Sequence, residues 1–150
     1  QCFAEHKPLS FEILDIDYFK QYNDRYGHQA GDDCVRAIAA LIRQMESDQI
    51  FCARYGGDEF VIIYSGMSAE EVCERAEKLR QDVMALQIEQ RYTEGAFGVT
   101  ISQGICHDIP SNGNKNWDFL HVADQALYRV KRRGRNRLCM TDIHGREIEV

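Results

Sequence analysis

The sequence contains no run of about 20 apolar residues that would span a membrane, and no signal peptide opens it. It also lacks internal repeats, low-complexity segments and any linker that would mark a second domain. These absences predict that residues 1–150 form one compact domain that makes no direct membrane contact itself. We expect a cytoplasmic location, with the alternative that the domain is the cytoplasmic portion of a membrane-anchored protein.

The sequence is also short of the patterns that indicate zinc or nucleic acid. Its six cysteines include no Cys-x-x-Cys pair, and its five histidines form no cluster. We therefore expect reduced thiols packed as small apolar groups, and assign no histidine to catalysis. The formal net charge of −6 argues against a nucleic-acid polymer as partner, because a phosphate-binding surface is normally basic.

The most informative segment that is present runs from Arg54 to Phe60 and contains Gly56-Gly57-Asp58-Glu59. Apolar, strand-like stretches flank it, at residues 50–53 and 60–64, so the glycine pair predicts a tight hairpin turn. Glycines allow a positive φ and the close approach of a ligand. Adjacent carboxylates at such a tip supply the hard oxygen ligands that Mg²⁺ prefers. A solvated acidic turn is the alternative, and for this motif alone it would be favoured.

A second acidic block follows the predicted strand at residues 9–16. Asp15 and Asp17 fall at the end of this strand, where the chain enters a helix whose first N–H groups and dipole favour anions. Asp15 is the better candidate for a metal ligand. For Asp17 we favour a helix N-cap over metal binding.

The remaining pattern predicts an α+β fold, in which an antiparallel-centred sheet is flanked by helices. Two segments have one apolar face, as expected for amphipathic helices packed on a core. We expect helices at 34–45, 69–86 and 117–132, an irregular hairpin at 87–98 with its turn at Glu94-Gly95, a strand at 99–106, a polar loop at 108–116, and a closing hairpin of 137–140 with 147–150.

Taken together, these motifs resemble the GGDEF domain of diguanylate cyclases. The two acidic blocks, the Val99–Ile105 strand and the closing segment from Ala123 to Arg137 occur in the family's order and cover the chain from near Pro8 to near Cys139. Several separated motifs in one order are far more specific than any single motif. The resemblance implies the family's palm-like nucleotidyl cyclase fold, which is ferredoxin-like.

The resemblance also implies a reaction. Two GTP molecules condense into cyclic di-GMP and two pyrophosphates, each 3′-hydroxyl attacking the other nucleotide's α-phosphate across a homodimer. The family's metal-binding positions match Asp15, the carbonyl of Ile16, Asp58 and Glu59. Two Mg²⁺ ions per site are expected, with Mn²⁺ as an alternative. Asp15, Asp58 and Glu59 are the implied catalytic residues; Asp58 is favoured as general base, although the sequence does not divide the labour.

Substrate binding is implied for two further sets of residues. The phosphates match the turn of Tyr18, Phe19 and Lys20 together with Lys131 and Arg135. A solvated helix end is the alternative for the late basic residues and explains most of them.

The guanine base matches Asn23 and Asp32, since a carboxylate selects the N–H groups of guanine. Asn23 as a helix-ending residue and Asp32 as the N-cap of a helix starting near Asp33 are alternatives that hold alongside this role.

Two departures from the family pattern bear on function. The family's opening segment is missing, and with it a structural brace. Ser47 and Ile50 replace the Arg and Asp of the inhibitory product site, so we expect weak product inhibition and disfavour a receptor role. A catalytically silent GTP-binding regulatory domain remains the alternative function. A sensory or regulatory domain is expected in the full-length protein.

Overall fold

The computed structural model describes residues 6–90, 98–111, 113 and 116–150. Five strands form one sheet in the order β2-β3-β1-β4-β5. All neighbouring strands are antiparallel except β4 and β5, which are parallel. The elements are β1 (Leu9–Ile16), α2 (Phe19–Tyr26), α3 (His28–Arg43), β2 (Ile50–Arg54), β3 (Glu59–Ser65), α4 (Ala69–Ala85), β4 (Ile101–Asp108), α5 (Asn116–Arg132) and β5 (Leu138–Thr141).

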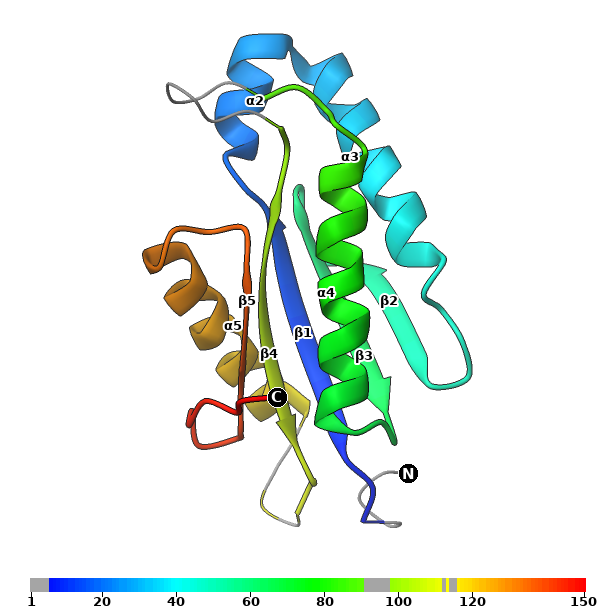
Figure 1. Ribbon diagram of the computed structural model, residues 1–150, viewed down its shortest axis with the longest axis vertical. Coiled ribbons are helices and arrows are strands. Elements are labelled where there is room, and N and C mark those ends of the chain that lie inside the picture. Colours follow the sequence, from blue (N-terminus) through cyan, green and yellow to red (C-terminus); the bar gives the residue numbers. More distant parts are fainter. Residues whose placement is uncertain (1–5, 91–97, 112, 114–115) are drawn as a thin grey trace.

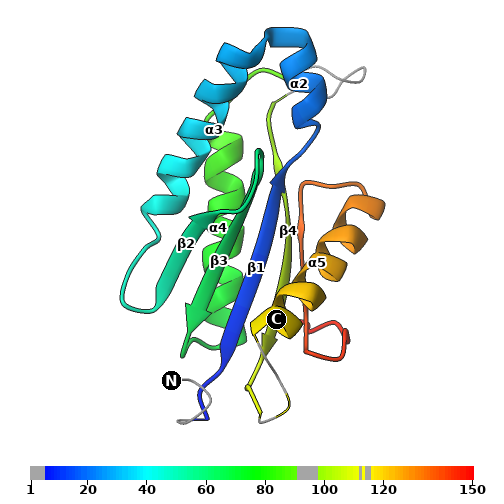
Figure 2. The same cartoon turned by 180° about the vertical axis from the view of Figure 1, so that it is seen from behind.

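The helices cover the two faces of the sheet unequally. Helices α3 and α4 lie on one face, and α5 lies alone on the other, over the β1, β4 and β5 half (Figures 1 and 2). Helix α2 stands beyond the end of β1, next to the start of α3 (Figure 1). The predicted α+β fold with an antiparallel-centred sheet is therefore confirmed.

Alternation along β1 explains the two hydrophobic cores. Leu14 and Ile16 belong to the larger core beneath α3 and α4, whereas Phe11 and Ile13 pack on the α5 side with Phe119. Successive side chains of a strand point to opposite faces, so a central strand needs apolar residues at nearly every position. One exception in β1 is Glu12, which is fully buried among polar partners.

Gly104 sets how closely α5 approaches the sheet. A Cβ at this position in β4 would lie 2.2 Å from the main-chain nitrogen of Leu127 and 2.4 Å from the carbonyl oxygen of Ala123. Real Cβ contacts are never this short, so the backbone of α5 would have to move. Only glycine permits the observed contact between helix and strand.

Several predicted boundaries are wrong. The second helix of the acidic block, α3, begins at His28 and not near Cys34, because Gly27, with φ of 93°, ends α2 and directly precedes α3. The expected strand at 147–150 is absent from the described residues, where a single bridge pairs Thr141 with Glu147. The strand predicted at 99–106 is displaced to 101–108. The Glu94-Gly95 turn lies outside the described residues.

Two further expectations concern the whole chain. No described helix has the length and apolar character needed to cross a membrane. The five described cysteines are free thiols: Cys34, Cys52, Cys73, Cys106 and Cys139. Burial raises the pKa of Cys34 to about 11, and burial is also the main cause that raises the pKa of Cys106 to about 12. Such thiols remain protonated at neutral pH and act as packing groups.

Candidate active site

The two acidic segments of the sequence meet where β1 ends beside the tip of the β2–β3 hairpin. Asp15, the next-to-last residue of β1, lies directly opposite Glu59, the first residue of β3. The Ile16 N–H donates to the carbonyl oxygen of Asp58 at 3.1 Å. The antiparallel register therefore brings the three carboxylates predicted to bind metal to one end of the sheet.

The hairpin tip is held by Arg54, whose Nε donates to the carbonyl oxygens of Gly56 (3.0 Å) and Gly57 (3.2 Å). The predicted hairpin turn is present, and neither glycine uses the positive φ that its lack of a side chain would allow. Both glycines are exposed, and a Cβ at Gly57 would meet nothing within 4 Å. In place of a special backbone conformation, the glycine pair provides an open surface beside Asp58.

Negative charge is concentrated at this tip. Burial is the main cause that raises the pKa of Asp58 to about 7, and the carboxyl groups of Asp15 and then Glu59 act in the same direction. Burial and then Asp15 raise the pKa of Glu59 as well, while Lys131 acts in the opposite direction. Carboxylates crowded in this way repel one another, and a bound cation relieves that repulsion.

The Asp15 carboxylate has hydrogen-bonding capacity that no described residue satisfies. The side chain is nearly buried, and its Oδ2 accepts a hydrogen bond from Lys131 Nζ. Its Oδ1 is buried and accepts no hydrogen bond. A buried carboxylate oxygen without a partner is costly, which indicates that a further cationic or donor group belongs there.

The donor chemistry fits Mg²⁺ shared with a nucleotide better than a metal enclosed by protein. In the described part of the chain, no three His, Cys, Asp or Glu side chains are grouped so as to hold a metal ion by themselves. Mg²⁺ is commonly bound by one or two carboxylates and completes its shell with waters and substrate phosphates. Asp15 and Asp58 are a pair of this kind.

Asp17 does not cap the following helix, so the predicted N-cap role is wrong. The N-cap position of α2 is Tyr18, and no side chain caps that helix end. The Asp17 carboxyl instead accepts hydrogen bonds from Thr100 Oγ1 (2.7 Å), Ser102 Oγ (2.6 Å) and the Asn136 N–H (3.1 Å). Burial raises its pKa, and these donors partly offset the effect. Asp17 therefore ties β4 and the segment after α5 to the end of β1.

The turn expected to hold phosphates has an unusual backbone. Tyr18 adopts the left-handed conformation with φ of 56°, and its carbonyl oxygen accepts a hydrogen bond from the buried Gln90 side chain at 3.0 Å. The Arg135 guanidinium lies 4.7 Å from the centre of the Tyr18 ring. Lys20 is exposed and pairs with Asp24. Phe19 stacks on Tyr22, with ring centres 6.3 Å apart.

The two residues expected to read guanine come from adjacent helices. The Asn23 Oδ1 atom is buried and has no hydrogen-bond partner. A Cβ at Gly31 would lie 1.8 Å from this oxygen, so a larger residue there would displace the Asn23 side chain. Asp32 follows Gly31 and is exposed. An unpaired buried acceptor beside an accessible carboxylate fits a base that presents N–H donors.

The alternative roles of this pair are corrected by the helix boundaries. Asp32 lies inside α3, which starts at His28, so it is not an N-cap. Asn23 lies inside α2, although its main-chain carbonyl accepts the Gly27 N–H that ends this helix.

Ile50 is buried in the larger core and Ser47 is exposed in the preceding turn, so neither position offers a charged group.

Sequence reasoning missed four polar residues that shape this site: Gln90, Thr100, Ser102 and Asn136. Thr100 and Ser102 carried a signal, since two polar residues at alternate positions interrupt an apolar strand. Gln90 and Asn136 carried none, because their partners lie 72 and 119 residues away in the sequence.

Comparison with known proteins places the chain in a well-defined group. The family model described as "Diguanylate cyclase, GGDEF domain" matches residues 1–137. The chain is 36% identical over 140 residues to a diguanylate cyclase of Vibrio cholerae, covering 89% of this chain and 40% of that protein. It is 35% identical over 133 residues to diguanylate cyclase DosC of Escherichia coli K12, covering 87% and 28%. The chain thus spans less than half of these curated relatives.

A solved structure gives the same result for the fold. The GGDEF domain of DgcB from Caulobacter crescentus, determined in complex with c-di-GMP, superposes with a TM-score of 0.82 at 33% sequence identity. The match covers 95% of this chain and 82% of that chain.

Proposed function

Because this chain belongs to the GGDEF domain family of diguanylate cyclases, we propose that it condenses two GTP molecules into cyclic di-GMP and two pyrophosphates. The observation that carries the proposal is the meeting of Asp15 with Asp58 and Glu59, in which Asp15 Oδ1 is buried without a partner. Retention of all three carboxylates favours an active domain over a silent one.

The proposal assigns a distinct task to each group of side chains. Asp15, Asp58, Glu59 and the carbonyl of Ile16 hold Mg²⁺, which when bound lowers the pKa of an attacking hydroxyl and neutralises charge on the leaving oxygens. Lys131 keeps Asp15 neutralised in the nucleotide-free protein, since its ammonium group already binds that carboxylate. When GTP is bound, Lys131 and Arg135 are assigned to its β- and γ-phosphates.

The start of α2 contributes main-chain donors to phosphate binding. The first N–H groups of a helix have no partner within it, and the eight-residue α2 begins directly after Tyr18. Lys20 stands beside these groups and is exposed. Asn23 and Asp32 then hold the guanine base, with Asp32 accepting from its N–H groups.

One domain binds one GTP in this proposal, so the reaction needs two domains facing each other. Each nucleotide supplies the hydroxyl that attacks its partner. We infer a homodimer, brought together by a sensory or regulatory part of the longer protein. Joining two copies raises their effective concentration without a new contact.

The experiment is to incubate the chain with GTP and Mg²⁺, both alone and fused to a dimerising coiled coil, and to quantify cyclic di-GMP. The expected result is product from the fused dimer that disappears in Asp58→Ala and Glu59→Ala. Glu74→Gln is the matched control, because it removes an exposed acid on α4 away from the site. Absence of product from a fused dimer that still binds GTP would support the silent regulatory domain instead.

A further inference from the structure

The segment that carries Arg135 has a backbone that must be held from outside. Gly134, Arg135 and Asn136 have φ angles of 114°, 65° and 49°, so three consecutive residues are left-handed. This conformation is strained for a residue such as arginine, while glycine and asparagine tolerate it better. Such strain persists only where the surrounding structure fixes it.

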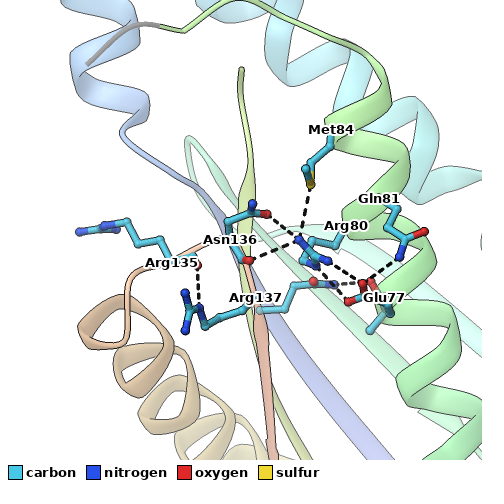
Figure 3. Close-up of polar contacts among 9 residues, drawn as sticks. Glu77, Arg80, Gln81, Met84, Arg135, Asn136 and Arg137 are labelled. Carbon is cyan, nitrogen blue, oxygen red and sulfur yellow. Dashed lines mark hydrogen bonds and ion pairs between the residues drawn. The ribbon is translucent and has the colours of Figure 1, made fainter. Parts of the chain in front are cut away.

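Helix α4 supplies that support through Arg80. Arg80 Nη1 donates to both the side-chain Oδ1 (2.9 Å) and the main-chain oxygen (3.3 Å) of Asn136 (Figure 3). These two contacts span 56 residues of sequence and recognise the backbone as well as the side chain of the strained segment. The side chain of Arg80 is only 18% exposed, so water competes weakly for its donors.

Arg80 is itself held in a defined orientation by Glu77. Its Nε and Nη2 donate to the two carboxylate oxygens of Glu77 at 2.9 and 2.6 Å, which is the bidentate arrangement that fixes a guanidinium plane. Gln81 Nε2 donates to the same carboxylate at 2.9 Å (Figure 3). The hydrogen bonds with Arg80 lower the pKa of Glu77, which keeps that carboxylate ionised.

The opposite side of Asn136 faces the candidate active site. Its N–H donates to Asp17 Oδ2 (3.1 Å) and to Ser102 Oγ (3.2 Å), while the neighbouring Arg135 lies over the Tyr18 ring. The Arg135 side chain points away from α4 and from Arg80 (Figure 3). Asn136 therefore connects Arg80 of α4 to Arg135, the residue that faces the phosphate-binding turn.

We infer that Arg80 is a positioning residue: through Asn136 it holds Arg135 in the orientation that binds the terminal phosphates of GTP. This inference rests on the proposed function. Arg80 does not touch the nucleotide, so its effect passes through Arg135 and is confined to the phosphates that Arg135 contacts. A purely structural tether between α4 and the end of α5 would instead affect binding of every nucleotide alike.

The test compares the affinities of GTP and GMP in the presence of Mg²⁺, measured by titration calorimetry. GMP lacks the β- and γ-phosphates but keeps the base and sugar. We expect Arg80→Gln to weaken GTP binding on the order of tenfold and GMP binding less than about twofold. In the Arg135→Ala background, Arg80→Gln should add almost nothing for GTP, because both changes remove the same contact. Lys78→Gln, an exposed cation on the same helix, is the matched control.

Equal weakening of GTP and GMP, or additive effects in the double variant, would overturn the inference. If Arg80→Gln does not fold, Asn136→Gly takes its place, because it removes only the Oδ1 acceptor and glycine accepts a left-handed backbone. The same selective loss of GTP affinity is expected from Asn136→Gly. An unchanged ratio of the GTP and GMP affinities would also overturn the inference. Failure of wild-type protein to bind GTP in preference to ATP would reject the proposed function itself, whereas normal GTP binding with an unchanged ratio rejects only the role of Arg80.

Discussion

Two acidic side chains on β1, Glu12 and Asp15, are both buried, yet their surroundings differ completely. Glu12 accepts hydrogen bonds from Tyr64 Oη (2.6 Å) and Gln103 Nε2 (2.8 Å), and both partners are neutral. Asp15, three residues later and thus on the opposite face of the sheet, binds Lys131 and leaves one oxygen unpaired. Asp58 and Glu59 add further negative charge around it.

The difference shows that burial alone does not identify a functional acid. Burial raises the pKa of Glu12 to about 7, despite the lowering effect of its two hydrogen bonds. Its neutral partners join it to β3, β4 and, through Gln103, the Ala76 carbonyl of α4, so Glu12 links four elements. The cluster at Asp15 has unsatisfied charge that a ligand would satisfy. Four substitutions test this difference between the two acids.

The largest effect is expected from Asp58→Asn, the variant that removes charge from the Asp15 cluster. Cyclic di-GMP formation in the fused dimer should fall on the order of 10²–10³-fold, as when other transition-state charge contacts are lost. Thermal stability should rise, because repulsion from Asp15 and Glu59 is relieved. Activity assays and melting curves on the same samples test the expected fall in activity and the expected rise in thermal stability. Retained activity would remove Asp58 from the site.

The second effect concerns Glu12 and changes stability instead of activity. Its pKa is about 7 in the folded state and near the ordinary 4.5 in the unfolded chain. The folded state therefore binds the proton more tightly, so stability falls as pH rises from about 4.5 to 7. Glu12→Gln should remove this contribution, which is roughly 3 kcal/mol at full effect.

Urea denaturation from pH 4.5 to 8 measures the Glu12 effect as the difference between wild type and Glu12→Gln. The difference is needed because Asp17, Asp58 and Glu59 also have raised pKa values and contribute in the same direction. Tyr64, Cys52 and Gln103 are the groups that face Glu12 and stay unchanged in the comparison. Parallel pH profiles for the two proteins would show that Glu12 is not the titrating group.

A smaller effect is expected from Tyr64→Phe, which deletes one donor to Glu12. The loss should be about 1–3 kcal/mol, because a buried acceptor is left without this partner. It should be greater at pH 8 than at pH 5, since the ionised carboxylate needs the donor more. Unfolding curves at the two pH values give the comparison. An equal loss at both would mean that Glu12 keeps one protonation state across this range.

The smallest stability effect is expected from Lys20→Ala at the phosphate turn. The Lys20–Asp24 pair is exposed on both sides, so the change should stay within about 0.5 kcal/mol. GTP affinity should nevertheless fall several-fold at low salt. Lys78→Ala, which breaks a similar exposed pair on α4, is the control and should leave GTP affinity intact. Equal affinities for the two variants would exclude Lys20 from phosphate binding.

How much of this molecule the sequence could predict depends on how local the signal is. Strand β1, the β2–β3 hairpin and α4 were predicted within a few residues, because their apolar periodicity and turn residues are local. The start of α3 was missed, since Gly27 joins two helices without a loop. The partners of Asp17 could not be predicted, because Thr100, Ser102 and Asn136 reach it only through the folded sheet.

The residues of the candidate site also divide into those with a local sequence signal and those without one. The acidic segments and the basic residues after α5 were identified from their spacing and from the family resemblance. Three features depend on how the chain packs and have no local signal: the unpaired oxygen of Asp15, the left-handed Tyr18 and the hydrogen bonds from Arg80 to Asn136. Glu12 had a signal that passed unused: an acid between Phe11 and Ile13 in an apolar strand.

The absence of a side chain at Gly104 affects the candidate active site, although Gly104 itself lies outside it. Helix α5 can lie against β4 only because this residue has no side chain, and the same helix carries Lys131 to Asp15. Adding a single methyl group at Gly104 would lift the helix and withdraw the ammonium group from the carboxylate. The reach of a lysine into the site is thus set by the absence of one carbon atom in the middle of the sheet.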